Sequence, residues 1–417
     1  MSNTTLISPL APEKFPELPA VAGVRLATGA CGVKYQGRTD LLLADLAAGT
    51  AVSGSLTQSK TASAPVLWCK ECLDEGEARG LVVNSGNANA FTGGHGKKAV
   101  EGTVKAVADA LSCRPSRVYT ASTGVIGEPL AYERIVEHIG GLAGDLANAD
   151  TPELWEAAAR AIMTTDTFPK GSGCKVKIGN AEVAITGICK GSGMIAPDMA
   201  TMLGFVFTDA KLPADVLQAL LTPGVGRSFN SITVDSDTST SDTVLLFATG
   251  AGADHGDIIQ ADDPALADFK IALDKVLLDL AHQIVRDGEG ASKFVSVTVS
   301  GAENDGAAKR IALSVANSPL VKTAIFAEDA NWGRIVAAVG KAGEAANRDR
   351  LSIVIGGVPV AEAGAAVDGY DETPVAQHMK SEEIDFAIDV GIGDGRATVW
   401  TCDLTHDYID INADYRS

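Results

Sequence analysis

The stretch Lys190–Leu203 carries the residues best suited to chemistry. It reads Lys-Gly-Ser-Gly-Met-Ile-Ala-Pro-Asp-Met-Ala-Thr-Met-Leu and joins two alternating apolar segments, 183–189 and 203–208, which have the period-2 pattern of strands. Glycines and a proline interrupt that pattern, so we predict a tight loop between two strands. Ala200 and Thr201 stand at the end of this loop. We predict that the chain cleaves itself between them, which makes Thr201 both a new N-terminus and a nucleophile.

A threonine at a chain N-terminus carries its own base. A threonine hydroxyl is a poor nucleophile at neutral pH, and a free α-amine with an ordinary pKa of about 7.7–8.0 can take its proton. The β-branched side chain also has few χ1 rotamers, which helps to orient the hydroxyl. The dipeptide Ala-Thr does not identify such a site, because it also occurs at 27–28, 248–249 and 397–398. Taken alone, Thr201 is better interpreted as an ordinary strand-opening residue.

The composition indicates a globular, acidic protein. Apolar residues make up 46% of the 417 residues and charged residues 21%, which is typical of globular proteins. The formal net charge of −19 argues against a nucleic-acid partner, since phosphate binding depends on clustered Lys and Arg. The N-terminus lacks the basic region and apolar core of a signal peptide, and no later segment is long and apolar enough to span a membrane. We therefore expect a cytoplasmic protein with no membrane partner.

Cysteine, histidine and aspartate patterns give no clear metal or redox site. The seven cysteines are an odd number without a secretion signal, which favours free thiols. Cys69 and Cys72 have the spacing of half a zinc site or a redox pair, but no second pair completes it. Asp235, Asp237 and Asp242 lack the glycine and terminal glutamate of a calcium loop, so we favour loop hydrogen bonding and expect no metal. The histidines form no hydrolase triad, which fits a base that is an α-amine.

Strand and helix patterns follow one another in a mixed order. Amphipathic periodicity predicts helices over 97–113, from 151 towards 164, over 213–221 and over 263–284. Short strands are predicted at 23–27, 30–34, 40–45, 65–68, 81–84, 117–120, 244–247, 294–299, 385–389 and 397–400, and a hairpin around residues 179–180. No internal repeat or low-complexity linker interrupts the chain. This mixture predicts helices packed on sheets.

The segment Lys190–Leu203 resembles the processing-site signature of the ornithine acetyltransferase / N-acetylglutamate synthase family of arginine biosynthesis. Further blocks similar to those of the family follow in order at 82–90, 122–127, 163–167, 232–240, 285–293, 318–323, 328–334 and 411–417. The blocks span nearly the whole chain, so the resemblance is specific. It implies an α/β (α+β) fold: an N-terminal-nucleophile-like αββα sandwich shared by two self-processed chains, 1–200 and 201–417, with a smaller C-terminal α/β domain.

The resemblance also assigns the catalytic residues. Thr201 matches the family's nucleophile, and Thr123 and Gly124 match its oxyanion pair. A hydroxyl and a sterically open backbone N–H suit the negative oxygen of an acyl-transfer intermediate, where one such donor contributes about 2.7–4 kcal/mol. Without the family blocks, a simple Thr-Gly turn would be the better interpretation.

The substrate-binding residues of the family match Thr164, Lys190, Thr201, Glu289, Asn412 and Ser417. The ammonium of Lys190 suits a substrate carboxylate, and the carboxylate of Glu289 suits a substrate ammonium. The assignment of Asn412 and Ser417 implies an ordered C-terminus, although chain ends are usually frayed. The chain departs from the family pattern at Asp198, where Asn is frequent, and at Ser417, where Thr is frequent.

The reaction implied by the resemblance is acetyl transfer. Thr201 takes the acetyl group of N2-acetyl-L-ornithine and passes it to L-glutamate in a ping-pong sequence. No cofactor is expected, and acetyl-CoA as a second acetyl donor is expected but left open. The two processed chains are expected to remain together as an α2β2 heterotetramer. Two alternatives stay open: a hydrolase or aminopeptidase in which water replaces glutamate, and a binding protein that never cleaves.

Overall fold

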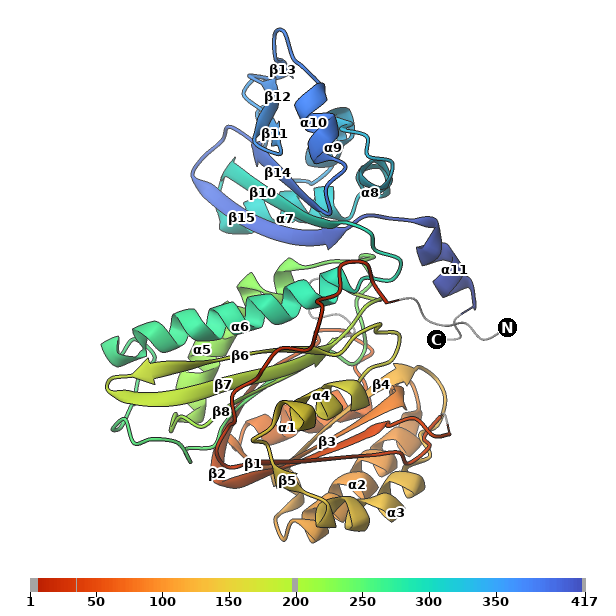
Figure 1. The fold of residues 1–417 in the computed structure, drawn as a ribbon, viewed down its shortest axis with the longest axis vertical. Helices are drawn as coiled ribbons and strands as arrows, with labels where there is room; N and C mark the ends of the chain where they lie inside the picture. Colours follow the sequence, from red (N-terminus) through yellow and green to blue (C-terminus); the bar gives the residue numbers. More distant parts are fainter. Residues whose placement is uncertain (1–6, 35, 197–201, 415–417) are drawn as a thin grey trace. The chain divides into compact units, whose positions relative to one another are not determined.

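The computed structural model describes residues 7–34, 36–196 and 202–414. These residues form two compact units (Figure 1). The large unit holds residues 12–230 and 237–284, and the small unit holds residues 7–11, 231–236 and 285–414. Residues 202–284 of the predicted second chain thus lie mostly in the large unit. The covalent division into 1–200 and 201–417 stays a prediction.

The large unit is built on one nine-stranded sheet that bends into two layers. Its strands are β1 (Val24–Gly29), β2 (Leu41–Leu56), β3 (Glu77–Asn87), β4 (Val118–Val125), β5 (Ala147–Asn148), β6 (Lys170–Ile178), β7 (Ala181–Lys190), β8 (Leu203–Thr208) and β9 (Thr243–Ala248). The main path runs β4-β3-β2-β9-β8-β7-β6. The first layer contains β1, β3 and β4, and the second contains β6, β7, β8 and β9. The long strand β2 joins the two layers, because its residues 41–46 pair with β1 and its residues 51–56 pair with β9. A register shift against β3 between Asp45 and Thr50 marks the bend.

The two layers pack their inner faces together. Leu81 of β3 and Tyr119 of β4 belong to the same buried cluster as Phe205 and Phe207 of β8. Helices α1 (Ala64–Leu73) and α4 (Pro152–Ala161) fill the space between the layers at its edges (Figure 1). The fully buried Trp155 of α4 has its ring 5.5 Å from that of Phe207.

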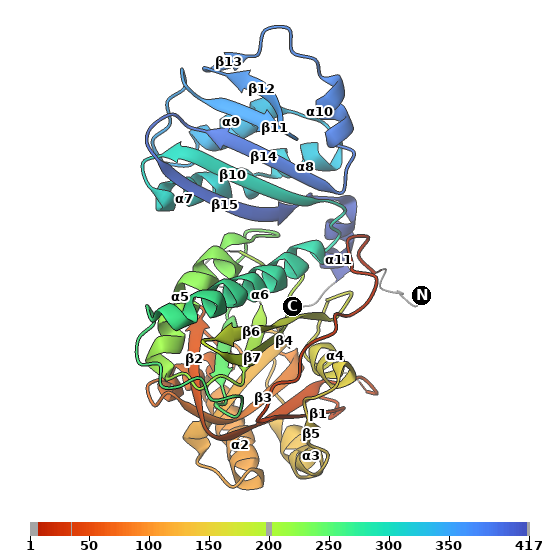
Figure 2. The ribbon, with the colours of Figure 1, turned by 60° about the vertical axis from the view of Figure 1, so that its left-hand side comes forward.

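Two helices cover the outer face of each layer, as Figure 2 shows from a second direction. Helices α2 (Gly93–Ala110) and α3 (Tyr132–Gly144) cover the first layer, where Val100 and Val104 cluster with Leu43 of β2. Helices α5 (Ala214–Arg227) and α6 (Ala267–Arg286) cover the second, and a Cβ at Gly187 of β7 would lie 2.8 Å from Leu280 of α6. The order of layers is helix, sheet, sheet, helix. The predicted αββα sandwich is confirmed.

The small unit is an α/β domain in which helices cover one face of a sheet. Its six-stranded sheet has the order β13-β12-β11-β14-β10-β15. These strands are β10 (Phe294–Ala302), β11 (Ser352–Ile355), β12 (Val358–Glu362), β13 (Ala365–Ala366), β14 (Glu383–Asp389) and β15 (Gly395–Cys402). Helices α7 (Asp305–Ala316), α8 (Pro319–Phe326) and α9 (Trp332–Gly340) cover one face, while buried and exposed residues alternate along β14. Helices α10 (Thr373–His378) and α11 (His406–Asp414) complete the unit.

Two secondary-structure predictions are wrong for reasons connected with proline. The predicted strand 65–68 lies in helix α1, where Pro65 occupies the first turn and needs no N–H partner. The predicted helix 213–221 does not stop before Pro223, because α5 continues to Arg227. Burial of Leu220, Leu221 and Val225 on the same face outweighs the roughly 3 kcal/mol that proline costs inside a helix.

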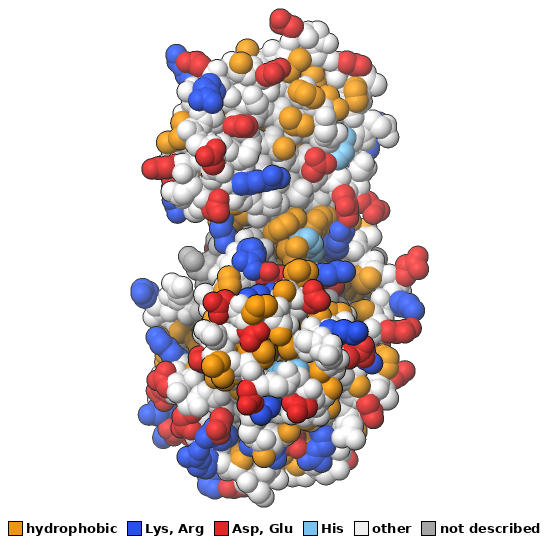
Figure 3. All heavy atoms as spheres, turned by 90° about the vertical axis from the view of Figure 1, so that its left-hand side faces the viewer, with side chains coloured by type: hydrophobic (Ala, Val, Ile, Leu, Met, Phe, Trp, Pro, Cys, Tyr) orange, Lys and Arg blue, Asp and Glu red, His pale blue; other side chains and the backbone are white. Residues whose placement is uncertain are grey.

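The described residues carry mixed charges on the face that Figure 3 shows, and the Cys69–Cys72 pair is buried. Acidic and basic side chains are interspersed on the face shown in Figure 3. Cys69 and Cys72 are buried in α1, and burial raises both thiol pKa values to about 12, which makes the thiols poor nucleophiles. Within the described part of the chain, no helix is long and apolar enough to cross a membrane.

Candidate active site

The predicted processing loop connects neighbouring strands of the second layer. Strands β7 and β8 are antiparallel, and Lys190 at the end of β7 lies opposite Leu203 at the start of β8. Directly opposed residues of such strands have Cα atoms about 4.5–5.5 Å apart. The loop therefore leaves and re-enters the sheet at one place. Ala200 and Thr201 lie outside the described residues, as does Ser417.

A buried aspartate, Asp242, holds the C-terminal end of the loop, called the far end below. The backbone N–H of Met202, which follows Thr201 directly, donates to Oδ1 of Asp242 at 2.8 Å. The backbone carbonyl of Asp242 in turn accepts from the N–H of Thr57 at 3.0 Å. Burial raises the pKa of the Asp242 carboxyl well above its usual value, although the Met202 N–H and the charge of Lys190 act in the opposite direction. Asp242 thus anchors the amide one residue beyond Thr201.

A second buried aspartate, Asp166, holds the N-terminal end of the loop, called the near end below. The carboxylate of Asp166 lies 2.7 Å from Nζ of Lys170 and 3.8 Å from Nζ of Lys190. It also accepts the backbone N–H of Gly191 at 2.6 Å and that of Thr164 at 3.0 Å. Burial alone would raise the pKa of Asp166, but the ammonium groups of Lys170 and Lys190 outweigh it and hold the pKa well below its usual value. Asp166 is therefore a carboxylate in the folded protein.

The connection between α4 and β6 joins these groups to the first layer. Oγ1 of Thr165 lies 2.7 Å from Oγ of Ser192 in the loop. In the other direction, Arg38 donates to the carbonyl of Met163 at 2.6 Å, and Oγ of Ser85 in β3 donates to the carbonyl of Ala161 at 2.9 Å. The large unit therefore brings the predicted substrate residues Thr164 and Lys190 together, about a single carboxylate.

The predicted oxyanion pair lies in β4, where it pairs with the end of β3. Thr123 is opposite Ser85, and Gly124 is opposite Gly86. A Cβ at Gly124, whose φ is +130°, would lie 2.3 Å from the carbonyl carbon of Gly86, so no side chain fits there. Thr123 is buried, and its Oγ1 has no hydrogen-bond partner among the described residues. A buried hydroxyl without a hydrogen-bond partner lowers the stability of the folded protein by about 1–3 kcal/mol. Such a hydroxyl is suited to donate a hydrogen bond to the oxygen of a ligand.

The other two predicted substrate residues that the structure describes, Glu289 and Asn412, meet in the small unit. Nδ2 of Asn412 in α11 donates to Oε2 of Glu289 at 2.8 Å. Two more contacts fix this helix: Oγ1 of Thr405 donates to the carbonyl of Gly290 at 2.7 Å, and the hydroxyl of Tyr408 donates to Asp235 at 3.2 Å. These contacts hold α11 against residues 235 and 289–290 within the small unit.

The sequence analysis did not single out Asp166 or Lys170, and for Asp242 it favoured loop hydrogen bonding without identifying the Met202 N–H as the partner. Asp166 lies within the block 163–167, but nothing in its sequence context shows that it is buried. The spacing of Asp166 and Lys170 could suggest an ion pair, yet such pairs are common on solvated surfaces.

Known proteins resemble this chain over its whole length. Residues 25–417 match the model of the ArgJ family. The arginine biosynthesis bifunctional protein ArgJ of Gluconobacter oxydans is 56% identical over 417 residues, covering 100% of this chain and 97% of the relative. The protein of the same name from Agrobacterium fabrum is 56% identical over 413 residues, covering 99% of each. The crystal structure of the Bacillus halodurans protein of that name is 40% identical, covers 51% of this chain and 98% of its own, and has a TM-score of 0.49.

The extent of these matches excludes a resemblance limited to single motifs. The family match begins at β1 and continues to the C-terminal residue, so it includes both compact units and every block quoted above. The prediction made from the motifs is confirmed: the chain belongs to the ArgJ family of arginine-biosynthesis acetyltransferases.

Proposed function

We propose that this chain is a self-cleaving acetyltransferase that moves the acetyl group of N2-acetyl-L-ornithine to L-glutamate. The observation that carries the proposal is the pairing of Lys190 with Leu203. This pairing places Lys190, whose ammonium suits a substrate carboxylate, opposite the first residue of β8, which lies two residues after Thr201. The hydroxyl of Thr123, for which the described residues offer no hydrogen-bond partner, gives independent support, because acyl transfer needs a donor for a developing oxyanion.

Self-cleavage and catalysis use the same hydroxyl. In processing, Oγ1 of Thr201 attacks the carbonyl carbon of Ala200, the peptide C–N bond breaks, and the resulting ester is hydrolysed by water. This step leaves a carboxylate on Ala200 and a free α-amine on Thr201. That amine then takes the hydroxyl proton in each catalytic cycle.

The transfer proceeds in two half-reactions. Oγ1 of Thr201 attacks the acetyl carbonyl carbon of acetylornithine, and the hydroxyl of Thr123 and the N–H of Gly124 stabilise the oxyanion. The amide C–N bond breaks, the α-ammonium of Thr201 gives its proton to the leaving nitrogen, and ornithine departs from an acetyl-Thr201 ester. The amine of glutamate then attacks this ester, which forms N-acetylglutamate and restores the hydroxyl.

Substrate recognition begins with the α-carboxylate, which acetylornithine and glutamate share. Lys190 binds this group with the help of Thr164. We also propose Glu289, Asn412 and Ser417 as substrate-binding residues, as the family resemblance implies. The exchange of one acyl group between nitrogen and oxygen requires no cofactor. Acetyl-CoA forms the same acetyl-threonine in a second activity, in keeping with the word bifunctional in the names of the relatives. We also propose an α2β2 assembly and a cytoplasmic location.

The experiment that tests this function follows the acetyl group. The purified protein is incubated with acetyl-labelled N2-acetyl-L-ornithine and L-glutamate, and labelled acetylglutamate and free acetate are both measured. We expect one acetylglutamate for each ornithine released, and Thr201→Ala should remain one piece and transfer nothing. Free acetate as the main product would instead identify a hydrolase, and an untouched substrate would identify a binding protein.

A further inference from the structure

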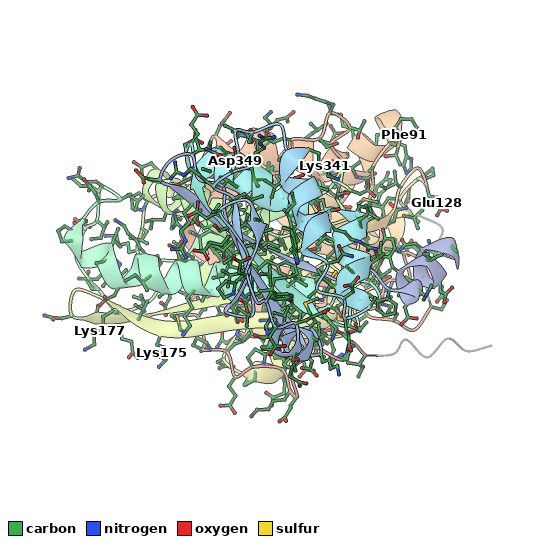
Figure 4. The ribbon with its side chains drawn as sticks, turned by 90° about the horizontal axis from the view of Figure 1, so that it is seen from above. Phe91, Glu128, Lys175, Lys177, Lys341 and Asp349 are labelled. Carbon is green, nitrogen blue, oxygen red and sulfur yellow. The ribbon has the colours of Figure 1, made fainter. Side chains whose placement is uncertain are left out.

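Two of the buried charges next to Lys190, those of Asp166 and Lys170, have no role in the reaction described above. Lysines are normally solvated, and two lysines of β6 follow this rule: Lys175 and Lys177 are exposed and point away from the strand in Figure 4. Lys170, at the other end of the same strand, has a side chain that is 0% exposed, and that of Lys190 is 2% exposed. The charge cluster, Asp166 with Lys170 and Lys190, therefore carries a desolvation penalty that a purely structural contact would not require.

The geometry shows what the cluster holds in place. One oxygen of Asp166 binds Nζ of Lys170 and the N–H of Gly191, both within 2.7 Å. The other accepts the N–H of Thr164 at 3.0 Å and faces Nζ of Lys190 at 3.8 Å. A single carboxylate thus fixes the side chain of Lys190, the backbone of Thr164 and the first residue of the loop. Lys170 adds the positive charge that keeps this carboxylate ionised in a dry environment.

We propose that Asp166 is a positioning residue for recognition of the substrate α-carboxylate. This inference rests on the proposed function, because it assigns Lys190 to that carboxylate. Asp166 acts through Lys190: it holds the ammonium in one orientation and aligns Thr164 with it, so that the carboxylate meets donors that are already fixed. Asp166 thereby sets the preference of the enzyme for N-acetyl-α-amino acids over N-acetylamines.

The test compares two acetyl donors that differ only in this carboxylate. The first is N2-acetyl-L-ornithine, and the second is its decarboxylated analogue, N-(4-aminobutyl)acetamide. The ratio of their kcat/KM values with glutamate as acceptor measures the preference. In Asp166→Asn, we expect this ratio to fall at least about tenfold, with the loss confined to acetylornithine. A residue that merely stabilised the fold would lower both values together and leave the ratio unchanged.

Three further variants make the result specific. Asp45→Asn is a matched control, because Asp45 is also a buried carboxylate between two cations, Arg25 and Arg79, on elements away from the loop. It should leave the ratio unchanged. Asp166→Glu, which keeps the charge but shifts it by one methylene, should restore part of the ratio. In a Lys190→Met background, Asp166→Asn should change the ratio little further, since both residues act on one contact.

The outcomes separate this inference from the proposed function. If the native enzyme transfers acetyl groups and Asp166→Asn has the same ratio of kcat/KM values for the two donors, the positioning role is wrong and the proposed function stands. A native enzyme that forms no acetylglutamate contradicts the function itself. If Asp166→Asn does not yield folded protein, Asp166→Glu decides: a lower ratio supports the positioning role, and an unchanged ratio overturns it.

Discussion

Asp166 and Asp242 hold opposite ends of the predicted processing loop, and both do so by accepting a backbone N–H. Asp166 binds Gly191 at the near end, and Asp242 binds Met202 at the far end. Both are buried, yet their pKa values move in opposite directions. Asp166 has the ammonium groups of Lys170 and Lys190 beside it, whereas burial dominates at Asp242. The neighbouring charges, and not the depth of burial, decide the direction in which each pKa moves.

This difference gives the two residues different tasks. An ionised Asp166 can orient a cation, and that cation is the residue that we assign to the substrate carboxylate. A carboxyl with a raised pKa, as at Asp242, is mainly a hydrogen-bond acceptor, and it fixes the amide that follows Thr201, the proposed nucleophile. Lys190 lowers the pKa of both carboxyls. This agrees with its position, because Lys190 ends β7 just before the loop and lies opposite Leu203, where the chain enters β8.

The largest effect should come from removing the charge of Asp166. In Asp166→Asn, the buried ammonium groups of Lys170 and Lys190 lose the negative charge of Asp166, which should lower the free energy of unfolding by about 3–5 kcal/mol at pH 7. Because the pKa of Asp166 is lowered by folding, its contribution is complete above its ordinary pKa of about 4 and is lost as the pH falls further. Unfolding measured between pH 7 and pH 3 should show the native and variant proteins converging at low pH. Equal stability at pH 7 would show that the charge cluster does not stabilise the fold.

A smaller effect is expected when Lys190 is removed. Lys190→Met should leave a folded chain, because Asp166 keeps its contact with Lys170. It should raise the KM for acetylornithine by about 10- to 100-fold, since a hydrogen bond between charged groups contributes about 1.5–3 kcal/mol. Steady-state kinetics over a range of acetylornithine concentrations measure this change. Unchanged kinetics would remove Lys190 from the substrate site.

The smallest effect on stability should come from Asp242. An amide in Asp242→Asn can still accept the N–H of Met202, and the folded protein already disfavours a charge at this position. We expect unchanged stability at pH 7, or an increase of about 1 kcal/mol. Because folding raises the pKa of Asp242, any penalty exists only above its ordinary pKa of about 4, and the increase should disappear at lower pH. A large loss of stability at pH 7 would indicate that the ionised form is required, and the contrast with Asp166 would be wrong.

The sequence predicts those parts of the fold that depend on local pattern. The spacing of apolar residues predicted helices α2 and α6, a continuous apolar run predicted β9, and alternation predicted the hairpin of β6 and β7. Helix α1 was missed because Pro65 suits a first helical turn as well as a strand edge. Pro223 did not end α5 because packing on the sheet, which is a tertiary effect, outweighs local preference.

The site is predictable from the sequence only as far as its motifs extend. The resemblance supplied Thr123, Lys190 and Thr164, and the structure brings the last two together about Asp166. The role of Asp166 depends on burial and on two lysines that converge from β6 and β7, and no spacing along the chain reveals that convergence. The predicted roles of Ala200, Thr201 and Ser417 stay predictions, because these residues lie outside the described part of the chain.

Intact mass and N-terminal sequencing of the purified protein test the central claim most directly. The account predicts two pieces, residues 1–200 and 201–417, the second of which begins Thr-Met-Leu-Gly. Only cleavage at this bond gives Thr201 the free α-amine that serves as its base. A full-length chain that transfers acetyl groups at the normal rate would contradict the account, because its base could not be an α-amine at Thr201.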